Sequence, residues 1–284
     1  MIKEYYRLTK PGIVYGNVLT TLAAYLFTSR WHIGFENFVA TILGIALVIA
    51  SACVFNNYFD RDIDKKMTRT KSRALVSGVI DVTYALLFGA VLGVVGFMLL
   101  FFFVNVLTGF VALVGFLVYI FAYTFSKRVT EWATEIGSIA GATPIVVGYT
   151  AVTGRFDLVA LIFFLILVFW QMPHFYSIAM FRSGEYAAAN IPVLPLKKGV
   201  HETKVRTLLY LSAFALAVFA LTFFGYTGYT YALVMGVVTL VWFWRCIDGF
   251  SVQDDETWAR KLFFFSLIVL LVFCAALALS PFLP

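Results

Sequence analysis

Nine long apolar runs follow one another along this chain, and the polar segments between them alternate between very short and long. The runs cover residues 12–28, 38–60, 82–103, 106–126, 134–153, 157–181, 206–224, 229–246 and 262–281. Most have the roughly 20 residues that a helix needs to cross a bilayer. Because backbone groups in lipid must find partners within the protein, runs of this length form helices. The pattern predicts an all-α, polytopic membrane protein with a bundle of nine transmembrane helices.

The composition excludes a water-soluble fold. Of the 284 residues, 62% are hydrophobic and 13% are charged, whereas soluble domains have roughly 45–50% apolar and 25% charged residues. We therefore expect a single integral-membrane domain over residues 1–284, with the lipid bilayer as its partner. The net charge of +6 is attributed to basic loops beside anionic lipid, so no nucleic-acid partner is expected.

The basic residues predict the orientation of the chain in the membrane. Only Arg30 and Arg155 of the 21 Lys and Arg residues fall on one side of the predicted bundle, which leaves 19 on the other. Loops that face the cytoplasm carry an excess of Lys and Arg. The N-terminus and all the large loops are therefore expected to be cytoplasmic.

The segment "VFNNYFDRDIDKKMTRTKSR", residues 54–73, closes the second apolar run with an unusual set of polar side chains. Asn56, Asp60 and Asp64 are spaced i, i+4, i+8, which places them along one face of a helix. Carboxylate and amide oxygens are hard ligands that suit Mg²⁺, and Mg²⁺ combines one or two carboxylates with phosphate oxygens. Asp62 lies off this face and is expected to pair with a nearby base.

Basic residues follow this stripe at once: Arg61, Lys65, Arg69, Lys71 and Arg73. Such cations suit a phosphate-rich ligand. The alternative is an ordinary solvated loop in which the acids and bases form salt bridges. The position of the oxygens at the end of an apolar run favours the ligand site, since polar groups at membrane depth are costly.

A second polar segment ends the sixth run, "WQMPHFYSIAMFRSGEYAAANIPVLP", residues 170–195. His174, Arg182 and Glu185 share one helical face, and Gln171 lies one turn before the histidine. His174 is a candidate base, donor to a substrate carboxylate, or ligand to an iron. Arg182 and Glu185 have a simpler alternative, which is to pair with each other.

Residues outside these two polar segments also carry a signal. "YTFSKR", residues 123–128, and "LTKPG", residues 8–12, bring Tyr123, Lys127, Arg128 and Lys10 to the same side as the acidic stripe, although flanking bases alone would account for them. The small residues of "GSIAGATPIVVG", 137–148, predict close helix packing. Three cysteines in apolar surroundings, Cys53, Cys246 and Cys274, are expected to be free and buried.

Taken together, these motifs resemble those of the UbiA-type intramembrane prenyltransferases. "NNYFDRDIDKKMTRTKSR" is similar to the first aspartate-rich motif of that superfamily, and "WQMPHFYSIAMFR…EYAAANIPVLP" looks like the haem O synthase (protohaem IX farnesyltransferase) branch. "LTKPG", "GATPIVVGYTAVTG" and "WARKLF" fit the same branch, so the resemblance covers essentially the whole chain.

The resemblance implies a nine-helix bundle whose central cavity opens to the cytoplasmic side of a bacterial inner membrane. Its implied reaction joins the farnesyl group of farnesyl diphosphate to a vinyl group of haem B, with water added, and gives haem O. Mg²⁺ is the implied cofactor, with the number of ions left open, and haem B is a substrate. A haem A synthase or a terminal oxidase is the implied partner.

The resemblance also assigns expected roles to residues. Mg²⁺ is bound by Asn56, Asp60 and Asp64, which with Lys127 form the expected catalytic set. The expected diphosphate-binding residues are Lys10, Arg61, Lys65, Arg69, Arg73, Tyr123 and Arg128. The expected haem-side residues are Gln171, His174, Arg182 and Glu185.

Two departures from the superfamily pattern affect these assignments. Many members carry Asp where Asn57 stands, which bears on the metal ligands. The second DxxxD motif is missing, and Arg182 and Glu185 occupy that neighbourhood. A neutral or basic second site suits a bulky acceptor that bears propionates better than it suits another metal.

Two other functions remain open from the sequence. A secondary transporter would use intramembrane acids to carry ions, but the charges gather at one face rather than at the midplane. A prenyltransferase acting on a quinone precursor is disfavoured by the missing second acidic motif and by "WQMPHF".

Overall fold

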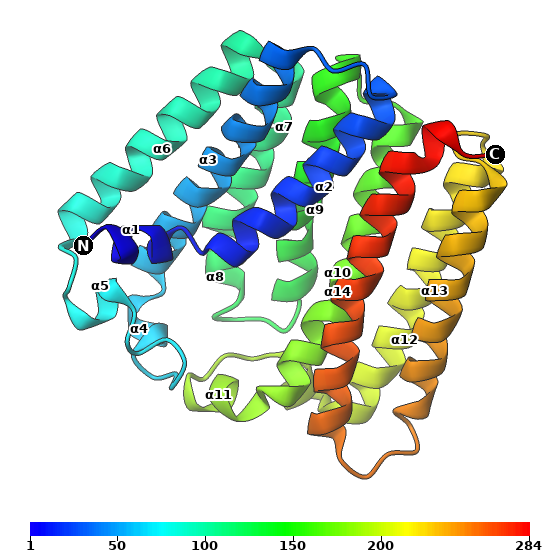
Figure 1. Ribbon diagram of the computed structural model, residues 1–284. Coiled ribbons are helices and arrows are strands. Elements are labelled where there is room, and N and C mark those ends of the chain that lie inside the picture. The colour runs from blue at the N-terminus through cyan, green and yellow to red at the C-terminus, as the bar shows by residue number, and fades with distance from the viewer.

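The computed structural model of the protein describes residues 1–284 and contains helices but no strands (Figure 1). The long helices are α2 (Pro11–Ser29), α3 (Phe35–Phe59), α6 (Val82–Phe103), α7 (Val106–Leu117), α9 (Ala133–Thr153), α10 (Leu158–Phe181), α12 (Leu194–Phe223), α13 (Tyr229–Asp248) and α14 (Asp255–Leu279). Helix α7 continues through a π-helix, η1 (Val118–Tyr123), into α8 (Thr124–Ser126). The expected all-α bundle is therefore confirmed.

The number of spans is close to the expected nine. Eight helices are long and apolar enough to cross a membrane, and they correspond to all the predicted runs except the first. The first run forms α2, a helix of 19 residues that packs in the same bundle. It is less apolar because it carries several polar residues, among them Asn17, Thr20 and Thr21, on its inward side.

Several polar segments that were expected to be loops are partly helical. The seventh span begins at Leu194 instead of residue 206, and Gly199 interrupts it with φ 87° and ψ 165°. The ninth begins at Asp255, where the Asp254 side chain caps the backbone N–H of Thr257. The remaining short helices are α1 (Ile2–Leu8), α4 (Arg61–Asp64), α5 (Ala74–Ser77), α11 (Ser183–Ala188) and the terminal 3₁₀ turn η2 (Ser280–Phe282).

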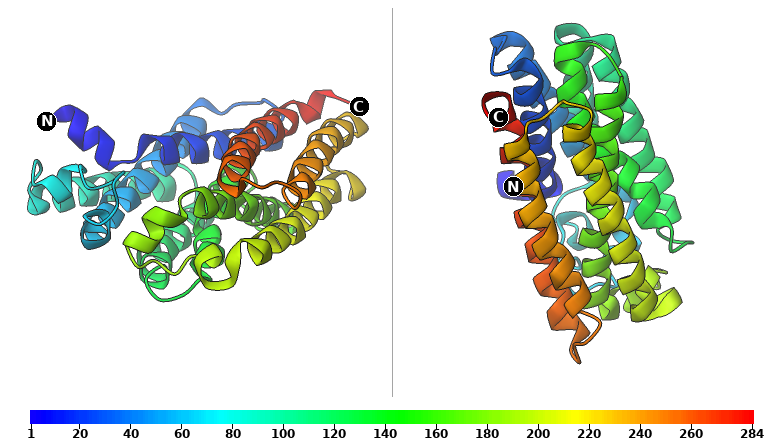
Figure 2. Two further views of the ribbon diagram at one scale, coloured as in Figure 1. Left: turned by 90° about the horizontal axis from the view of Figure 1, so that it is seen from below. Right: turned by 90° about the vertical axis from the view of Figure 1, so that its right-hand side faces the viewer.

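The helices form a closed circuit in which neighbours along the chain pack together and α14 returns to contact α2. Helices α6 and α13 lie on opposite flanks of the bundle (Figures 1 and 2). The short helices α4, α5 and α11 gather at one end (Figure 1), which we call the basic end because the charged segments 61–73 and 182–206 lie there. Arg30 and Arg155 lie in loops at the other end.

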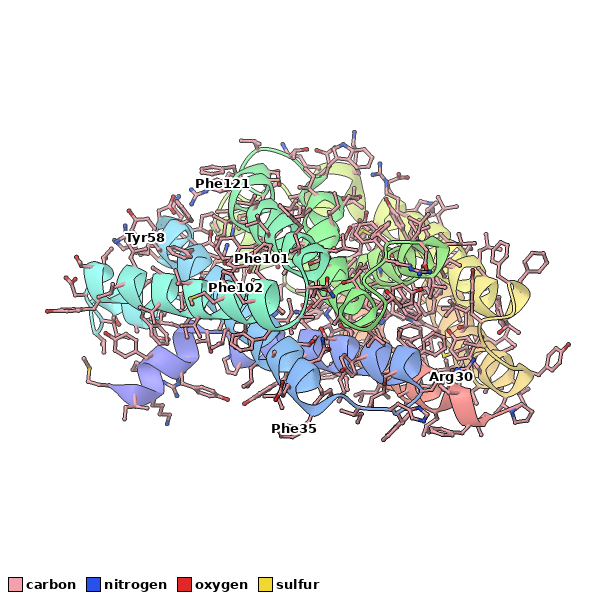
Figure 3. All side chains as sticks on the ribbon, turned by 90° about the horizontal axis from the view of Figure 1, so that it is seen from above. Arg30, Phe35, Tyr58, Phe101, Phe102 and Phe121 are labelled. Atoms are coloured by element: carbon pink, nitrogen blue, oxygen red, sulfur yellow. The ribbon has the colours of Figure 1, made fainter.

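The outside of the bundle carries large apolar side chains. Phe35, Phe102 and Phe121, labelled in Figure 3, are 76%, 78% and 54% exposed. Monomeric soluble proteins do not expose apolar surface on this scale. These side chains are therefore assigned to contact with lipid. The three cysteines are buried and free, as expected.

Glycines allow the helices to approach closely in the half of the bundle away from the basic end. A Cβ built on Gly148 of α9 would lie 2.1 Å from the backbone oxygen of Thr21 in α2, and one on Gly96 of α6 would lie 2.9 Å from that of Gly44 in α3. Thr21 also donates a hydrogen bond to Pro144 O across the α2–α9 contact (2.8 Å). The predicted packing through small residues is confirmed at this contact.

Replacing Gly148 with Ala should destabilise the protein by several kcal/mol, since the added methyl meets backbone that cannot move aside. The measurement is the thermal unfolding midpoint in detergent. Gly236→Ala is the matched control, because its Cβ would meet only Phe219 at 3.6 Å. Equal midpoints for the two variants would contradict the close α2–α9 contact.

Candidate active site

A cavity of about 790 Å³ lies inside the bundle toward the basic end. Its wall is formed by the halves of α2, α3, α9, α10 and α14 nearest that end, together with η1 and the segment that follows it. Apolar residues line much of the wall, whereas the polar residues come mainly from the two segments that the sequence singled out. The volume is in the upper part of the range for small-molecule sites.

The predicted stripe of oxygen ligands forms part of this wall. Asp60 ends α3 with φ −89° and ψ 0°, so the helix is interrupted there and resumes as α4. Backbone bonds nevertheless continue from Asp60 N to Asn56 O (2.9 Å) and from Asp64 N to Asp60 O (2.8 Å). The three side chains are buried and face the cavity together, as their spacing predicts.

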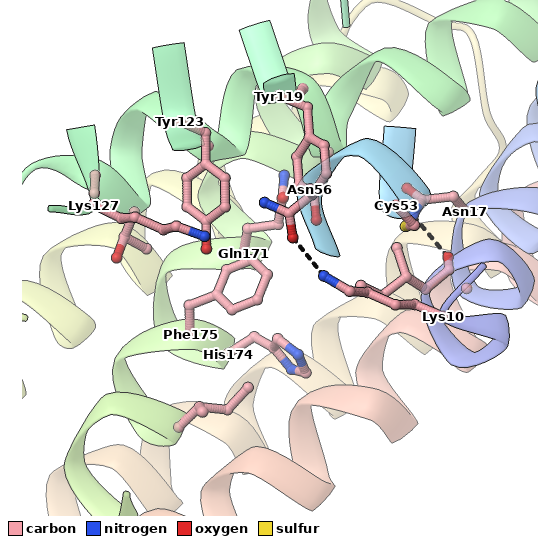
Figure 4. A pocket seen from close by; sticks show the side chains of 18 of the residues that line it. Lys10, Asn17, Cys53, Asn56, Tyr119, Tyr123, Lys127, Gln171, His174 and Phe175 are labelled. Carbon is pink, nitrogen blue, oxygen red and sulfur yellow. Dashed lines mark hydrogen bonds between the residues drawn. The ribbon is translucent and has the colours of Figure 1, made fainter. Parts of the chain in front are cut away.

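Each member of the stripe is held by one cation from a different part of the chain. The pairs are Lys10 with Asn56, Lys127 with Asp60, and Arg73 with Asp64. Lys10 Nζ donates to Asn56 Oδ1 at 2.5 Å (Figure 4), and Arg73 Nη1 donates to Asp64 Oδ2 at 2.6 Å. Burial lowers the pKa of the Lys10 ammonium to about 8, which leaves it mostly protonated at neutral pH.

The amide of Asn56 has a fixed orientation. Thr124 donates its hydroxyl proton to Tyr119 O (2.9 Å), so its oxygen accepts from Asn56 Nδ2 (3.1 Å). This arrangement directs Asn56 Oδ1 toward Lys10 and the cavity. Thr124 was not singled out in the sequence, because nothing in its local pattern reveals a partner 68 residues away.

The basic residues after the stripe divide into two groups. Arg69 and Arg73 line the cavity, but Arg61, Lys65 and Arg128 do not. Arg61 lies 4.4 Å from the centre of the Tyr58 ring. Lys65 is exposed.

Arg128 pairs with Asp62 instead of facing the cavity. It donates to both carboxylate oxygens, at 2.7 and 2.8 Å, so the predicted pairing of Asp62 with a base is confirmed. The bond from Arg128 lowers the pKa of Asp62 to about 2. The pair therefore stabilises the fold above the ordinary Asp pKa and is lost as the pH falls toward 2; at such an exposed position it contributes less than about 1 kcal/mol.

The π-helix η1 places two tyrosines on the cavity wall. The rings of Tyr119 and Tyr123 are stacked, with centroids 5.5 Å apart and planes 17° apart, and both hydroxyls point into the cavity in Figure 4. Single π-helical turns inside α-helices occur frequently at functional sites. Tyr123 was expected here, whereas Tyr119 was missed because it reads as one more aromatic in an apolar run.

The second polar segment contributes the opposite wall. His174 stacks on Trp170 (4.8 Å between ring centroids, 23°) and contacts Phe263 (4.9 Å). Its Nδ1 lies 2.8 Å from Ser266 Oγ. Ser266 donates its only hydroxyl proton to Phe263 O (2.6 Å), so it accepts from His174 Nδ1–H. The neutral imidazole therefore has an unprotonated Nε2, an assignment that follows from the hydrogen-bond network.

The other predicted haem-side residues occupy different positions. Gln171 lines the cavity, but its amide N–H groups donate to Ser138 O and Leu167 O, at 3.0 and 2.8 Å. Arg182 lines the cavity and pairs with Glu185 at 2.8 Å. Glu185 itself does not form part of the wall. Ser266 was missed because it is a single polar residue within an apolar run.

The two polar segments are joined by a small apolar cluster. Ile63 and Met67, from the first segment, pack against Ala189 and Ile191 from the second. This contact joins the two segments at the basic end, and both line the same cavity. It also brings the two halves of the predicted site together, which the sequence could not show.

The charge and ligand set of the cavity define what it can bind. Five cationic side chains and three carboxylates line it: Lys10, Arg69, Arg73, Lys127 and Arg182 against Asp60, Asp64 and Glu131. No three His, Cys, Asp or Glu side chains lie close enough together to hold a metal ion by themselves. Asp60 Oδ1 is buried without a hydrogen-bond partner, so the site fits a cation such as Mg²⁺ whose remaining ligands come from an anionic substrate.

Comparison with known proteins identifies the family of this chain. Residues 17–268 match the UbiA prenyltransferase family. The protoheme IX farnesyltransferase of Yersinia pseudotuberculosis serotype O:1b (strain IP 31758) is 48% identical over 271 residues, which cover 95% of this chain and 92% of that protein. The protoheme IX farnesyltransferase of Photorhabdus laumondii is 45% identical over 285 residues, with 100% and 97% covered.

Solved structures with the same fold include more distant proteins. A structure of digeranylgeranylglyceryl phosphate synthase has a TM-score of 0.83 at 18% identity and covers 99% of this chain and 98% of its own. A UbiA homolog from Archaeoglobus fulgidus, bound to GPP and Mg²⁺, has a TM-score of 0.67 at 14% identity, with 96% and 99% covered. At these identities the likeness concerns the fold.

Proposed function

This chain belongs to the UbiA prenyltransferase family, and we propose that it transfers the farnesyl group of farnesyl diphosphate to a vinyl group of haem B to give haem O. The observation that carries the proposal is one cavity with two different walls. On one wall, the buried oxygen atoms of Asn56, Asp60 and Asp64 each contact a cationic side chain. On the other wall, which we call the aromatic shelf, aromatic rings pack around the His174 imidazole. The relatives named as protoheme IX farnesyltransferases support the choice of substrates.

The first wall binds the diphosphate. Arg73 and Lys127 pair with the two carboxylates of the stripe, and Lys10 donates to its amide. They would donate to phosphate oxygens when the diphosphate enters, with Arg69 at the mouth of the cavity and Tyr123 beside Lys127. Arg61, Lys65 and Arg128 have no part in this proposal, because they lie away from the cavity.

Asn56, Asp60 and Asp64 are the residues that would hold Mg²⁺. They supply only amide and carboxylate oxygens, the ligands that this ion prefers. When bound, Mg²⁺ supplies charge neutralisation as the diphosphate leaves. The A. fulgidus homolog with the same fold, bound to GPP and Mg²⁺, supports this cofactor.

The second wall binds the haem. The unprotonated Nε2 of His174 is a suitable ligand for the haem iron, since Ser266 holds the ring through Nδ1. Trp170 and Phe263 would pack beside the planar macrocycle. The Arg182 guanidinium, at the basic end, suits a haem propionate.

The reaction follows from the placement of these groups. The bond between farnesyl C1 and the diphosphate oxygen breaks, and its electron pair leaves with the diphosphate, where Lys and Arg stabilise the charge. The allylic carbon then bonds to the terminal vinyl carbon of haem B. Water adds to the neighbouring carbon and gives up a proton, which yields the hydroxyethylfarnesyl side chain of haem O. The apolar helices keep bulk water from the allylic cation until it reacts.

The rival functions are less well supported. A second metal and diphosphate site, as an acidic second motif would form, is replaced here by the Arg182–Glu185 pair. The charged residues that line the cavity come from the ends of helices and from loops at the basic end, and they do not form a relay across the membrane, as a transporter would need.

The location of the protein is part of the same proposal. The 19 Lys and Arg residues at the basic end support a cytoplasmic placement of that end in a bacterial inner membrane. Farnesyl diphosphate and haem B would both reach the cavity from this side. Haem O would then pass to a haem A synthase or a terminal oxidase.

The test is an assay of the purified protein with farnesyl diphosphate, haem B and Mg²⁺. The haem pigments are separated by chromatography, and their molecular masses are measured by mass spectrometry. The expected product is haem B plus one farnesyl group and one hydroxyl group. Removal of Mg²⁺ with a chelator should stop its formation. Folded protein that yields no farnesylated haem would overturn the proposal.

A further inference from the structure

Residues 8–10 join α1 to α2, and we call them the N-terminal arm. The backbone of this arm has an unfavourable conformation at Lys10. Lys10 joins α1 to α2 with φ 51° and ψ 65°, in the left-handed region. A residue with a Cβ is disfavoured in this region, and the following Pro11 restricts it further toward extended conformations. The rest of the structure must therefore hold the arm in place.

Two contacts hold the arm, and both involve Leu8. The Leu8 side chain is 3% exposed and packs in an apolar cluster with Val54 of α3 and with Leu75 and Ile80 from the segment after α4. The Leu8 carbonyl accepts a hydrogen bond from Asn57 Nδ2 at 2.7 Å. Asn57 thus fixes the backbone two residues before Lys10.

Asn57 lies outside the cavity, although its neighbour Asn56 lines it. Successive residues of a helix point about 100° apart, so Asn56 faces the cavity while Asn57 faces α1. Asn57 is 3% exposed, and its Oδ1 has no hydrogen-bond partner. Its contact with the arm therefore depends on the N–H group alone.

We propose that Asn57 is a positioning residue for the diphosphate-binding cation: it acts through Leu8 to hold Lys10 against Asn56, and it does not bind metal. The inference rests on the proposed function for the role of Lys10. It assigns to Asn57 a contact with the N-terminal arm and no place on the cavity wall.

The chemistry of the contact explains why this position requires an amide. An ionised Asp has no donor for the Leu8 carbonyl and would place a second acceptor against it. It would also bury a negative charge at this position. An acid at position 57, which many superfamily members carry, would in this chain release the arm without gaining contact with the cavity.

The test is a double-mutant cycle of Asn57→Ala and Lys10→Met in the full-length protein, measuring kcat and the KM for farnesyl diphosphate. Each single change is expected to raise that KM about tenfold or more. The double variant should match Lys10→Met alone, because residues that act through one contact are not additive. Asn57→Asp should behave like Asn57→Ala. If Asn57→Ala does not fold, Asn57→Ser takes its place in the cycle; it keeps a donor and should retain part of the affinity for farnesyl diphosphate.

Asn105→Ala is the matched control. Asn105 Nδ2 also donates to a backbone carbonyl, that of Thr150 at 3.0 Å, but at the other end of the bundle. Its loss should lower thermal stability without changing the KM for farnesyl diphosphate. Multiplicative effects of Asn57→Ala and Lys10→Met, or an unchanged KM in Asn57→Ala, would overturn the inference.

Direct binding separates this inference from the proposed function. The same cycle can be measured by calorimetry with farnesyl diphosphate and Mg²⁺ in the absence of haem. A wild-type protein that binds no farnesyl diphosphate overturns the proposed function and the role of Lys10 with it. Binding by the wild type with independent effects of the two substitutions overturns only the positioning role of Asn57.

Discussion

Asp60→Asn is expected to reduce farnesyl transfer at least about a thousandfold while the protein remains folded. Asp60 is buried on the cavity wall, its Oδ1 has no partner, and its other oxygen pairs with Lys127. The substitution keeps the shape of the side chain but removes one of the two carboxylates in the stripe. Metal-assisted charge stabilisation is worth several kcal/mol, and each 1.4 kcal/mol is a factor of ten in rate.

The measurement is the rate of haem O formation over a range of Mg²⁺ concentrations, with thermal unfolding as the check on folding. Asp62→Asn is the matched control two residues away. The Asp62 side chain is 65% exposed and pairs with Arg128 outside the cavity, so its replacement should leave the rate unchanged. A normal rate in Asp60→Asn, or an equal loss in both variants, would remove Asp60 from the metal site.

His174→Ala is expected to weaken haem binding at least about tenfold, which corresponds to 1.4 kcal/mol, and to leave farnesyl diphosphate binding intact. The imidazole is held between Ser266 and the Trp170 and Phe263 rings, with Nε2 unprotonated. Its removal takes away an iron ligand and part of the aromatic shelf. The diphosphate cations lie on the opposite wall and keep their contacts.

Haem titration followed by absorption spectroscopy measures this effect, and calorimetry measures farnesyl diphosphate binding separately. A shift of the haem absorption band in the variant identifies Nε2 as an iron ligand, whereas weaker binding with an unchanged band identifies His174 as an orienting group. His201→Ala is the control, because His201 is exposed on α12 and packs against Phe250. Unchanged haem affinity in His174→Ala would remove the histidine from the haem wall.

The sequence predicted the membrane-spanning helices well because each long apolar run is a local signal. Their ends were less well predicted where polar residues remain helical, as in the first turns of α12 and α14. The stripe of Asn56, Asp60 and Asp64 was also a local prediction. It holds despite the break at Asp60, since the i→i−4 backbone bonds continue through it.

The charged segment after the stripe shows where prediction from sequence ends. Arg61, Lys65, Arg69 and Arg73 look alike in the sequence, but only Arg69 and Arg73 line the cavity. No periodic pattern distinguishes them, because the segment turns irregularly between α4 and α5. Which base faces inward depends on contacts such as that of Met67 with Ala189 and Ile191, more than 100 residues away in the chain.

The sequence by itself determined that this protein lies in a lipid bilayer, where its helices are, on which side its charges gather, and that a row of oxygen ligands lies at the end of α3. These properties depend on hydrophobicity and helical periodicity, which act over a few turns. Only the tertiary structure decided which cation meets each oxygen, that Ser266 orients His174, and that Asn57 faces the N-terminal arm instead of the cavity. These contacts depend on how helices rotate and approach one another, and that is set by packing between segments distant in the chain.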